Sequence, residues 1–196
     1  MTSSQPEETY RAVKWALAGA DLSTRALRRV VETSGSLAVE VETTRNRCEA
    51  VEQGGELAEL FALVLTEIRS LTDDADRAYE STKLIAEECE GNLRAVLTEF
   101  ENTIVDRRYI GLDEQSDRIA MWVEEIEQLR DRAERDLIAL ADKLAEDRSL
   151  PVAVLTQMDQ AVEVMQSLTA TVAVARDAVG TLVNNVARST ESAVGA

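Results

Sequence analysis

Residues 154–186 read VLTQMDQAVEVMQSLTATVAVARDAVGTLVNNV, and this stretch carries the strongest periodic signal in the chain. Its apolar residues recur in alternating steps of four and three without a polar interruption, which is the spacing of a buried seam on a long α-helix. The seam consists of Val154, Met158, Ala161, Met165, Leu168, Val172, Ala175, Val179, Leu182 and Val186. This apolar face is widened by Val162, Val164, Val174 and Val183. We therefore expect a helix surrounded by partner helices, from this chain or from another.

Glycine, proline and short polar runs divide the rest of the chain into three more amphipathic segments. The predicted helices span approximately 6–52, 55–108, 113–148 and 151–189, and residues 190–196 are predicted to form a frayed tail. The clearest boundaries are Gln53-Gly54-Gly55, the connector that begins at Tyr109, and Ser149-Leu150-Pro151. The run Thr-Ser-Gly-Ser at 33–36 interrupts the first apolar stripe and is compatible with a break, a kink or a phase shift. Residues 70–74 could cap a new helix inside the second segment.

These segments predict an all-α fold. The chain has 196 residues, aromatic side chains make up only 4% of it, and there are two prolines and eight glycines. This composition suits helices packed through small aliphatic side chains and lacks the turn residues and strand runs that a sheet needs. We expect an elongated antiparallel helical bundle or coiled coil of about four long helices, the first and second of which are open to a break. Residues 1–196 are predicted to form a single elongated domain.

Two positions on the predicted seams need comment. In the second segment the seam passes through Cys89, and an extra four-residue step near Gly91 places Leu93 on it, as a stutter would. In the third segment Arg130 occupies a core-type position. We expect its stem to lie along the seam and its guanidinium group to reach water.

The charge of the chain limits its partners. There are 37 acidic and 21 basic side chains, which give a formal net charge of −16. Such a chain repels phosphate backbones, so we expect no nucleic-acid partner. The acidic residues are concentrated in the second and third segments, where we expect them to face outward. No run of about 18 apolar residues is present, so no integral membrane association is expected.

The N-terminal sequence Met-Thr-Ser-Ser-Gln-Pro-Glu-Glu has neither the basic start nor the apolar core of a signal peptide. We expect a cytoplasmic protein and leave signal-less secretion open.

One residue type that many catalytic and metal sites need is missing. The chain has no histidine, which excludes Ser-His-Asp and Cys-His catalysis, His-ligated zinc and the Glu-x-x-His pairs of di-iron bundles. Cys48 and Cys89 fall at apolar helical positions and are expected to be buried free thiols. We predict no catalytic residue, no metal ligand and no cofactor, and hence no enzyme.

The remaining class of function is protein interaction. We predict a non-enzymatic structural or adaptor protein that acts through helix-mediated, coiled-coil assembly with itself or with a protein partner. Trp15 is expected at the edge of the core, whereas Trp122 lies off the register of its helix and is the better candidate for a second interface. The predicted interaction residues are Trp122, Met158, Met165, Leu168, Val172, Val179, Leu182 and Val186.

Two alternative functions remain. The turn at Gly54-Gly55, followed by Tyr109-x-x-x-Asp113, resembles the helical hairpins of the WXG100 family. This resemblance covers at most the first 113 residues and implies a substrate or partner of a specialised bacterial secretion system, often a dimer. The Trp-x-Gly motif of that family belongs at the turn, where this chain has no tryptophan. The fourth segment, rich in Ala and Val, also permits an amphipathic granule coat similar to the phasins.

Overall fold

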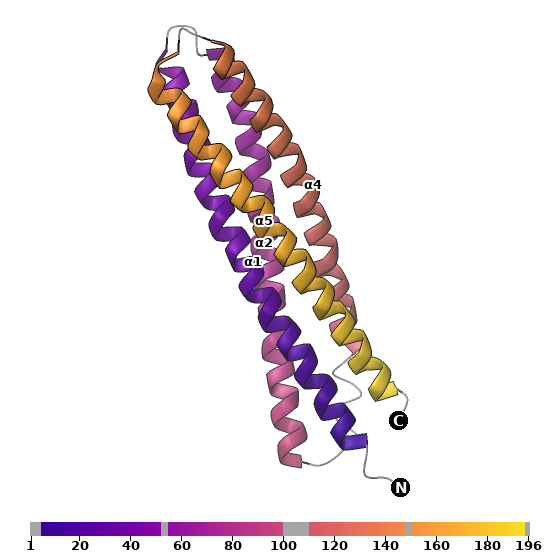
Figure 1. The fold of residues 1–196 in the computed structure, drawn as a ribbon. Coiled ribbons are helices and arrows are strands. Elements are labelled where there is room, and N and C mark those ends of the chain that lie inside the picture. Colours follow the sequence, from indigo (N-terminus) through magenta and orange to yellow (C-terminus); the bar gives the residue numbers. More distant parts are fainter. Residues whose placement is uncertain (1–4, 52–54, 100–109, 148–149, 195–196) are drawn as a thin grey trace. The chain divides into compact units, whose positions relative to one another are not determined.

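The computed structural model describes residues 5–51, 55–99, 110–147 and 150–194, and nearly all of these residues are helical. Figure 1 shows four long helices along the chain. They are α1 (Gln5–Glu49), α2 (Gly55–Glu99), α4 (Ile110–Glu146) and α5 (Val152–Val194). No strand occurs in the described residues. The prediction of an all-α helical bundle is therefore confirmed.

Both helices that the sequence left open to a break are continuous where they are described. The α1 helix passes through 33–36, and α2 passes through 70–74. The hydroxyl of Ser36 donates to the carbonyl of Glu32 at 3.0 Å, and the buried Ser34 donates to Val31 at 3.1 Å. Because each hydroxyl bonds the preceding turn of its own helix, these polar residues remain compatible with helical backbone. The Gln53-Gly54 part of the first turn and Tyr109 lie outside the described residues.

The chain divides into two compact units, and each unit contains a part of all four helices. Unit 1 comprises Met1–Arg28, Asp76–Glu124 and Val174–Ala196. Unit 2 comprises Arg29–Ala75 and Glu125–Ala173. The single elongated domain stays a prediction.

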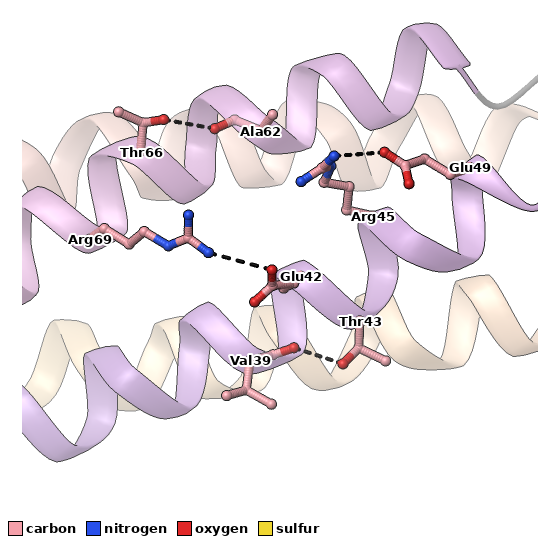
Figure 2. Close-up of polar contacts among 8 residues, drawn as sticks. All are labelled: Val39, Glu42, Thr43, Arg45, Glu49, Ala62, Thr66 and Arg69. Carbon is pink, nitrogen blue, oxygen red and sulfur yellow. Dashed lines mark hydrogen bonds and ion pairs between the residues drawn. The ribbon is translucent and has the colours of Figure 1, made fainter.

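Unit 2 has a core of large apolar side chains and several polar contacts between its helices. Its largest fully buried side chains are Phe61, Leu37, Leu65, Ile68, Leu71, Ile126 and Leu137. The Thr72 hydroxyl lies 2.9 Å from the hydroxyl of the buried Ser34. Figure 2 shows the contact between Arg69 and Glu42, which lie 3.4 Å apart. Between these two contacts the residue number rises on α1, from 34 to 42, as it falls on α2, from 72 to 69.

The contacts of α5 in unit 2 follow the same rule. The Arg47 guanidinium of α1 donates to the carbonyl of Ala153 at 2.7 Å, and the Gln157 amide donates to the carboxylate of Glu40. On α4, Glu134 accepts from Thr169 at 3.4 Å. These bonds connect α5 to both α1 and α4.

Unit 1 depends on small residues where α1 meets α5. Ala12, Ala16, Ala20 and Ser23 of α1 are buried. A Cβ atom added to Gly19 would lie 3.0 Å from the Cα atom of Leu182 and 3.3 Å from Nδ2 of Asn185. The backbones of α1 and α5 therefore approach so closely that glycine is needed at this position.

The α5 seam is buried as its periodicity predicts. All ten residues from Val154 to Val186 expose 2% or less of their surface. The wider apolar face is not fully covered, because Val174 exposes 54%. Partner helices therefore cover the seam of α5 and leave part of its flank open.

Two core positions can be compared with the sequence-based expectation. On α2 the seam continues from Cys89 to Asn92, which is 3% exposed, while Leu93 is only half-buried. The buried seam of α2 keeps its regular three-residue step from Cys89 to Asn92, and the apolar Leu93 is not part of it. On α4 the Arg130 side chain exposes only 15%, and its Nη2 atom lies 2.7 Å from Oδ1 of Asp131. Most of the side chain is buried along the seam, and its guanidinium group pairs with the exposed carboxylate of Asp131.

Candidate interaction surface

Seven of the eight predicted interaction residues lie in the bundle core. Met158, Met165, Leu168, Val172, Val179, Leu182 and Val186 expose 2% or less. Their burial is explained by helices of the same chain, so it gives no sign of a partner. Trp122, the eighth residue, is half-buried on α4. A role of these residues in binding stays a prediction.

An exposed apolar surface lies instead on α1 in unit 1. Trp15 exposes 51% of its surface and Leu22 exposes 50%. They are seven residues apart, so helical geometry places them on one face, two turns from each other. The small residue between them, Ala18, is also exposed.

Cationic side chains surround these apolar residues. Arg11 and Lys14 precede the pair, and Arg25 follows it one turn later; all three are exposed. No ion pair joins any of the three to another residue in the described part of the chain. We name Arg11, Lys14, Trp15, Ala18, Leu22 and Arg25 the α1 surface.

The opposite face of α1 holds this surface in place. The Asn185 side-chain amide of α5 donates to the main-chain carbonyl of Trp15 at 3.0 Å. One turn further along, Gly19 permits the close backbone approach to Leu182. The α1 surface is thus carried on a helix whose inner face is fixed to α5. On α1 itself, the side chains of Tyr10, Arg11, Lys14, Trp15 and Ala18 line a surface hollow.

The sequence predicts Trp15 at the edge of the core. In the structure the buried residues around it are Ala12, Val13, Ala16 and Ala20. These buried residues define a seam on which Trp15 does not lie. Because three of them are alanines, the seam is harder to recognise from the sequence than that of α5. On a helical wheel centred on these alanines, Trp15 lies on the solvent-exposed side of α1.

A second apolar hollow lies between α2 and α4 in unit 2. It is lined by Leu60, Leu63, Val64, Asp136, Ala139, Leu140 and Lys143. Near it, burial and the Asp136 carboxylate raise the pKa of Glu67, while Arg132 and Arg135 lower it. Acidic and basic groups are mixed around this hollow, so it favours no one sign of charge in a partner.

No group of three or more potential metal-ligating side chains occurs among the described residues. In the same part of the chain, no helix is both long enough and apolar enough to cross a membrane.

Both cysteines are free and buried, as the sequence predicts. Burial raises the pKa of the Cys48 thiol. Burial, with the carboxylates of Glu88 and Asp21, raises the pKa of the Cys89 thiol from 9.0 to about 12. The nucleophilic form is the thiolate, which is therefore disfavoured at neutral pH.

We expect neither thiol to react with a disulfide reagent at about pH 8 until the protein unfolds. Because the folded pKa of Cys89 is raised, its contribution to stability is complete below about pH 9 and is lost as the pH rises towards about 12. The number of protein thiols that react with the reagent, measured with and without denaturant, tests this expectation. Rapid reaction of one thiol per chain in the native protein would contradict it.

Comparisons of the chain with protein-family models, with curated proteins and with solved structures found no match. The class that the fold and surface define is a helical bundle with an exposed cationic and apolar face.

Proposed function

We propose that this chain is a non-enzymatic assembly protein. Its helices form an antiparallel coiled-coil bundle within each unit, and outward-facing side chains join one copy to another. The α1 surface carries this proposal, because it exposes apolar side chains among cations on a chain whose net charge is −16.

The antiparallel arrangement is supported by the direction of the contacts. In unit 2, Ser34 pairs with Thr72 and Glu42 with Arg69, so numbers rise on one helix as they fall on the other. The alternating four- and three-residue steps of the buried seams support coiled-coil packing. With the seams occupied inside the chain, association is left to the outer faces.

The strength of the association follows from the exposed area. Half of a tryptophan and half of a leucine offer roughly 200 Å² of apolar surface, which is worth about 5 kcal/mol at about 25 cal/mol per Å². Association costs at least about 4 kcal/mol in lost translational and rotational freedom. Apolar burial alone is therefore barely sufficient, and the surrounding charges must add to it. We expect a weak, reversible and salt-sensitive assembly.

Sedimentation velocity over a range of protein concentrations tests the proposal. At low ionic strength the weight-average mass should rise above the chain mass of 21.5 kDa as the concentration increases. The weight-average mass should return towards that of one chain when added salt shortens the Debye length from about 14 Å to about 4 Å. A mass of one chain at every concentration would contradict self-assembly.

The two alternatives have less support. The secretion-system interpretation depends on the hairpin turn and on Tyr109, whose structure is not described. A granule coat would need a broad apolar face on α5, but among the side chains of that helix that the structure describes, the exposed large apolar ones are Val152 and Val174. The first lies at the beginning of α5 and the second near its middle, so they form no continuous face.

A further inference from the structure

We infer that the α1 surface binds an acidic stripe on α4 of a second copy of this chain. The inference rests on the proposed function and names the two surfaces through which copies join. The α4 stripe consists of Glu114, Asp117, Met121 and Glu124.

The α4 stripe is an outward face of unit 1. Its members follow one another in steps of three, four and three, so they share one side of the helix. All four are exposed, and Met121 exposes 61% of its surface. The opposite side of α4 carries the buried Ser116, Ile119 and Val123. Met121 is therefore an apolar side chain in water between carboxylates, as Trp15 and Leu22 are between cations.

The charges of the two helix segments are complementary. Residues 10–28 of α1 contain four basic side chains and one acidic one. Residues 110–124 of α4 contain four acidic side chains and one basic one. In the described part of the chain, no ion pair neutralises the three carboxylates of the α4 stripe. Opposite potentials on two weakly apolar faces favour their encounter and fix their register.

The acidic outer face of α2 is the competing surface in unit 1. It also exposes an apolar residue, Leu84. Two of its carboxylates already have cations on the same helix, since Lys83 lies 3.6 Å from Glu80 and Arg94 lies 3.4 Å from Glu90. Residues 76–94 contain five acidic and three basic side chains, whereas residues 110–124 of α4 contain four acidic and one basic, so the α4 segment has the larger excess of negative charge.

The spacing of the two surfaces also fits. With Met121 set over the small Ala18, its side chain lies between Trp15 and Leu22, as a knob lies in a hole. When the two helices run antiparallel, this register brings Lys14 to Glu124 and Arg25 to Glu114. At a rise of about 1.5 Å per residue, the cations lie about 16 Å apart and the carboxylates about 15 Å apart.

The proposed contact joins two different surfaces, so each added copy can make the same contact with a further copy. Each copy presents one α1 surface and one α4 stripe, and a copy bound through one of them keeps the other free. Such heterologous contacts produce open chains, or rings when the rotation closes. The assembly therefore has no fixed size set by the contact itself.

Charge reversal tests the pairing. The first variant carries Lys14→Glu and Arg25→Glu, and the second carries Glu114→Lys and Glu124→Lys. Each should weaken self-association at least tenfold in sedimentation velocity, because like charges then face each other. A one-to-one mixture of the two variants should restore assembly, and so should one chain that carries all four substitutions.

Two controls isolate the surfaces. Arg132→Glu with Lys143→Glu changes the net charge as much as the first variant does, at exposed positions of unit 2. This control should assemble like the wild type. Trp15→Ala should weaken assembly, whereas Val39→Ala, at a residue that is 61% exposed on α1 in unit 2, should not. Circular dichroism of each variant checks that the helices are retained.

The outcomes separate the inference from the proposed function. If the wild type assembles and both charge variants assemble equally well, the inference is overturned and the proposed function stands. If the variants dissociate but neither the mixture nor the fourfold variant recovers, the α4 stripe is not the partner of the α1 surface. If the wild type remains a single chain at every concentration, both are overturned.

Discussion

Replacing Phe61 with alanine is expected to lower the free energy of unfolding by about 3–5 kcal/mol. Phe61 is fully buried on α2, and no other described side chain buried to this degree is larger. Removing its ring takes away apolar contacts and leaves a cavity that the neighbouring helices fill only in part. Because a typical domain is stable by about 5–15 kcal/mol, this loss is a large fraction of the total. Urea unfolding followed by circular dichroism measures it.

Leu63 is the matched control for Phe61. It lies two residues further along the same helix and exposes 64% of its surface. Leu63→Ala should change the free energy of unfolding by about 0.5 kcal/mol or less. Equal losses for the two variants would mean that the burial pattern of α2 in unit 2 is wrong.

Gly19→Leu is expected to destabilise unit 1 by about 3 kcal/mol, at the upper end of overpacking effects. Even a methyl group at this position would lie 3.0 Å from the Leu182 Cα atom, and main-chain atoms cannot move aside as a flexible side chain can. The larger side chain must push α1 away from α5. Thermal unfolding and the exchange protection of amides in α1 are the measurements.

Gly180 gives the opposite result and is the control for Gly19. It lies inside α5, and a Cβ added there meets nothing within 4 Å. Gly180→Leu should stabilise the helix by about 0.5–1 kcal/mol, because leucine is the better helix former. If both substitutions stabilise the protein, the close approach of α1 and α5 does not exist.

The sequence predicts the helices and the α5 core because large apolar residues repeat without interruption there. Every member of the seam from Val154 to Val186 is buried. The helical stretch at 33–36 was ambiguous because serine, threonine and glycine are poor helix formers in isolation. In the structure, the hydroxyls of Ser34 and Ser36 bond the preceding turn of their helix, and Ser34 also contacts Thr72.

The surface was harder to predict than the core. The α1 surface is recognised only when the buried seam of α1 is known, and in unit 1 that seam includes the small residues Ala12, Ala16 and Ala20 beside Val13 and Leu27. Small residues signal burial weakly, because their helical periodicity differs little from that of an exposed alanine-rich face. Asn92 was also not predicted to be buried. Tertiary packing places this polar residue in a seam position, next to the apolar Leu93.

Residue types alone cannot distinguish a seam filled by the same chain from one filled by another copy. Knobs-into-holes packing uses the same apolar spacing in both cases. In the structure, inter-helix bonds such as Gln157 to Glu40 and Asn185 to Trp15 join helices of one chain within each unit. The proposed interface between copies is therefore placed on the outer faces of the helices.

The central claim is that each chain closes its own core and associates only through its outer faces. The concentration dependence of unfolding tests it most directly. At about 0.5 M salt, where charges separated by more than about 4 Å are screened, urea unfolding should give the same midpoint at about 1 µM and about 100 µM chain. A midpoint that rises with protein concentration under these conditions would show that copies share the core, and the account would be wrong.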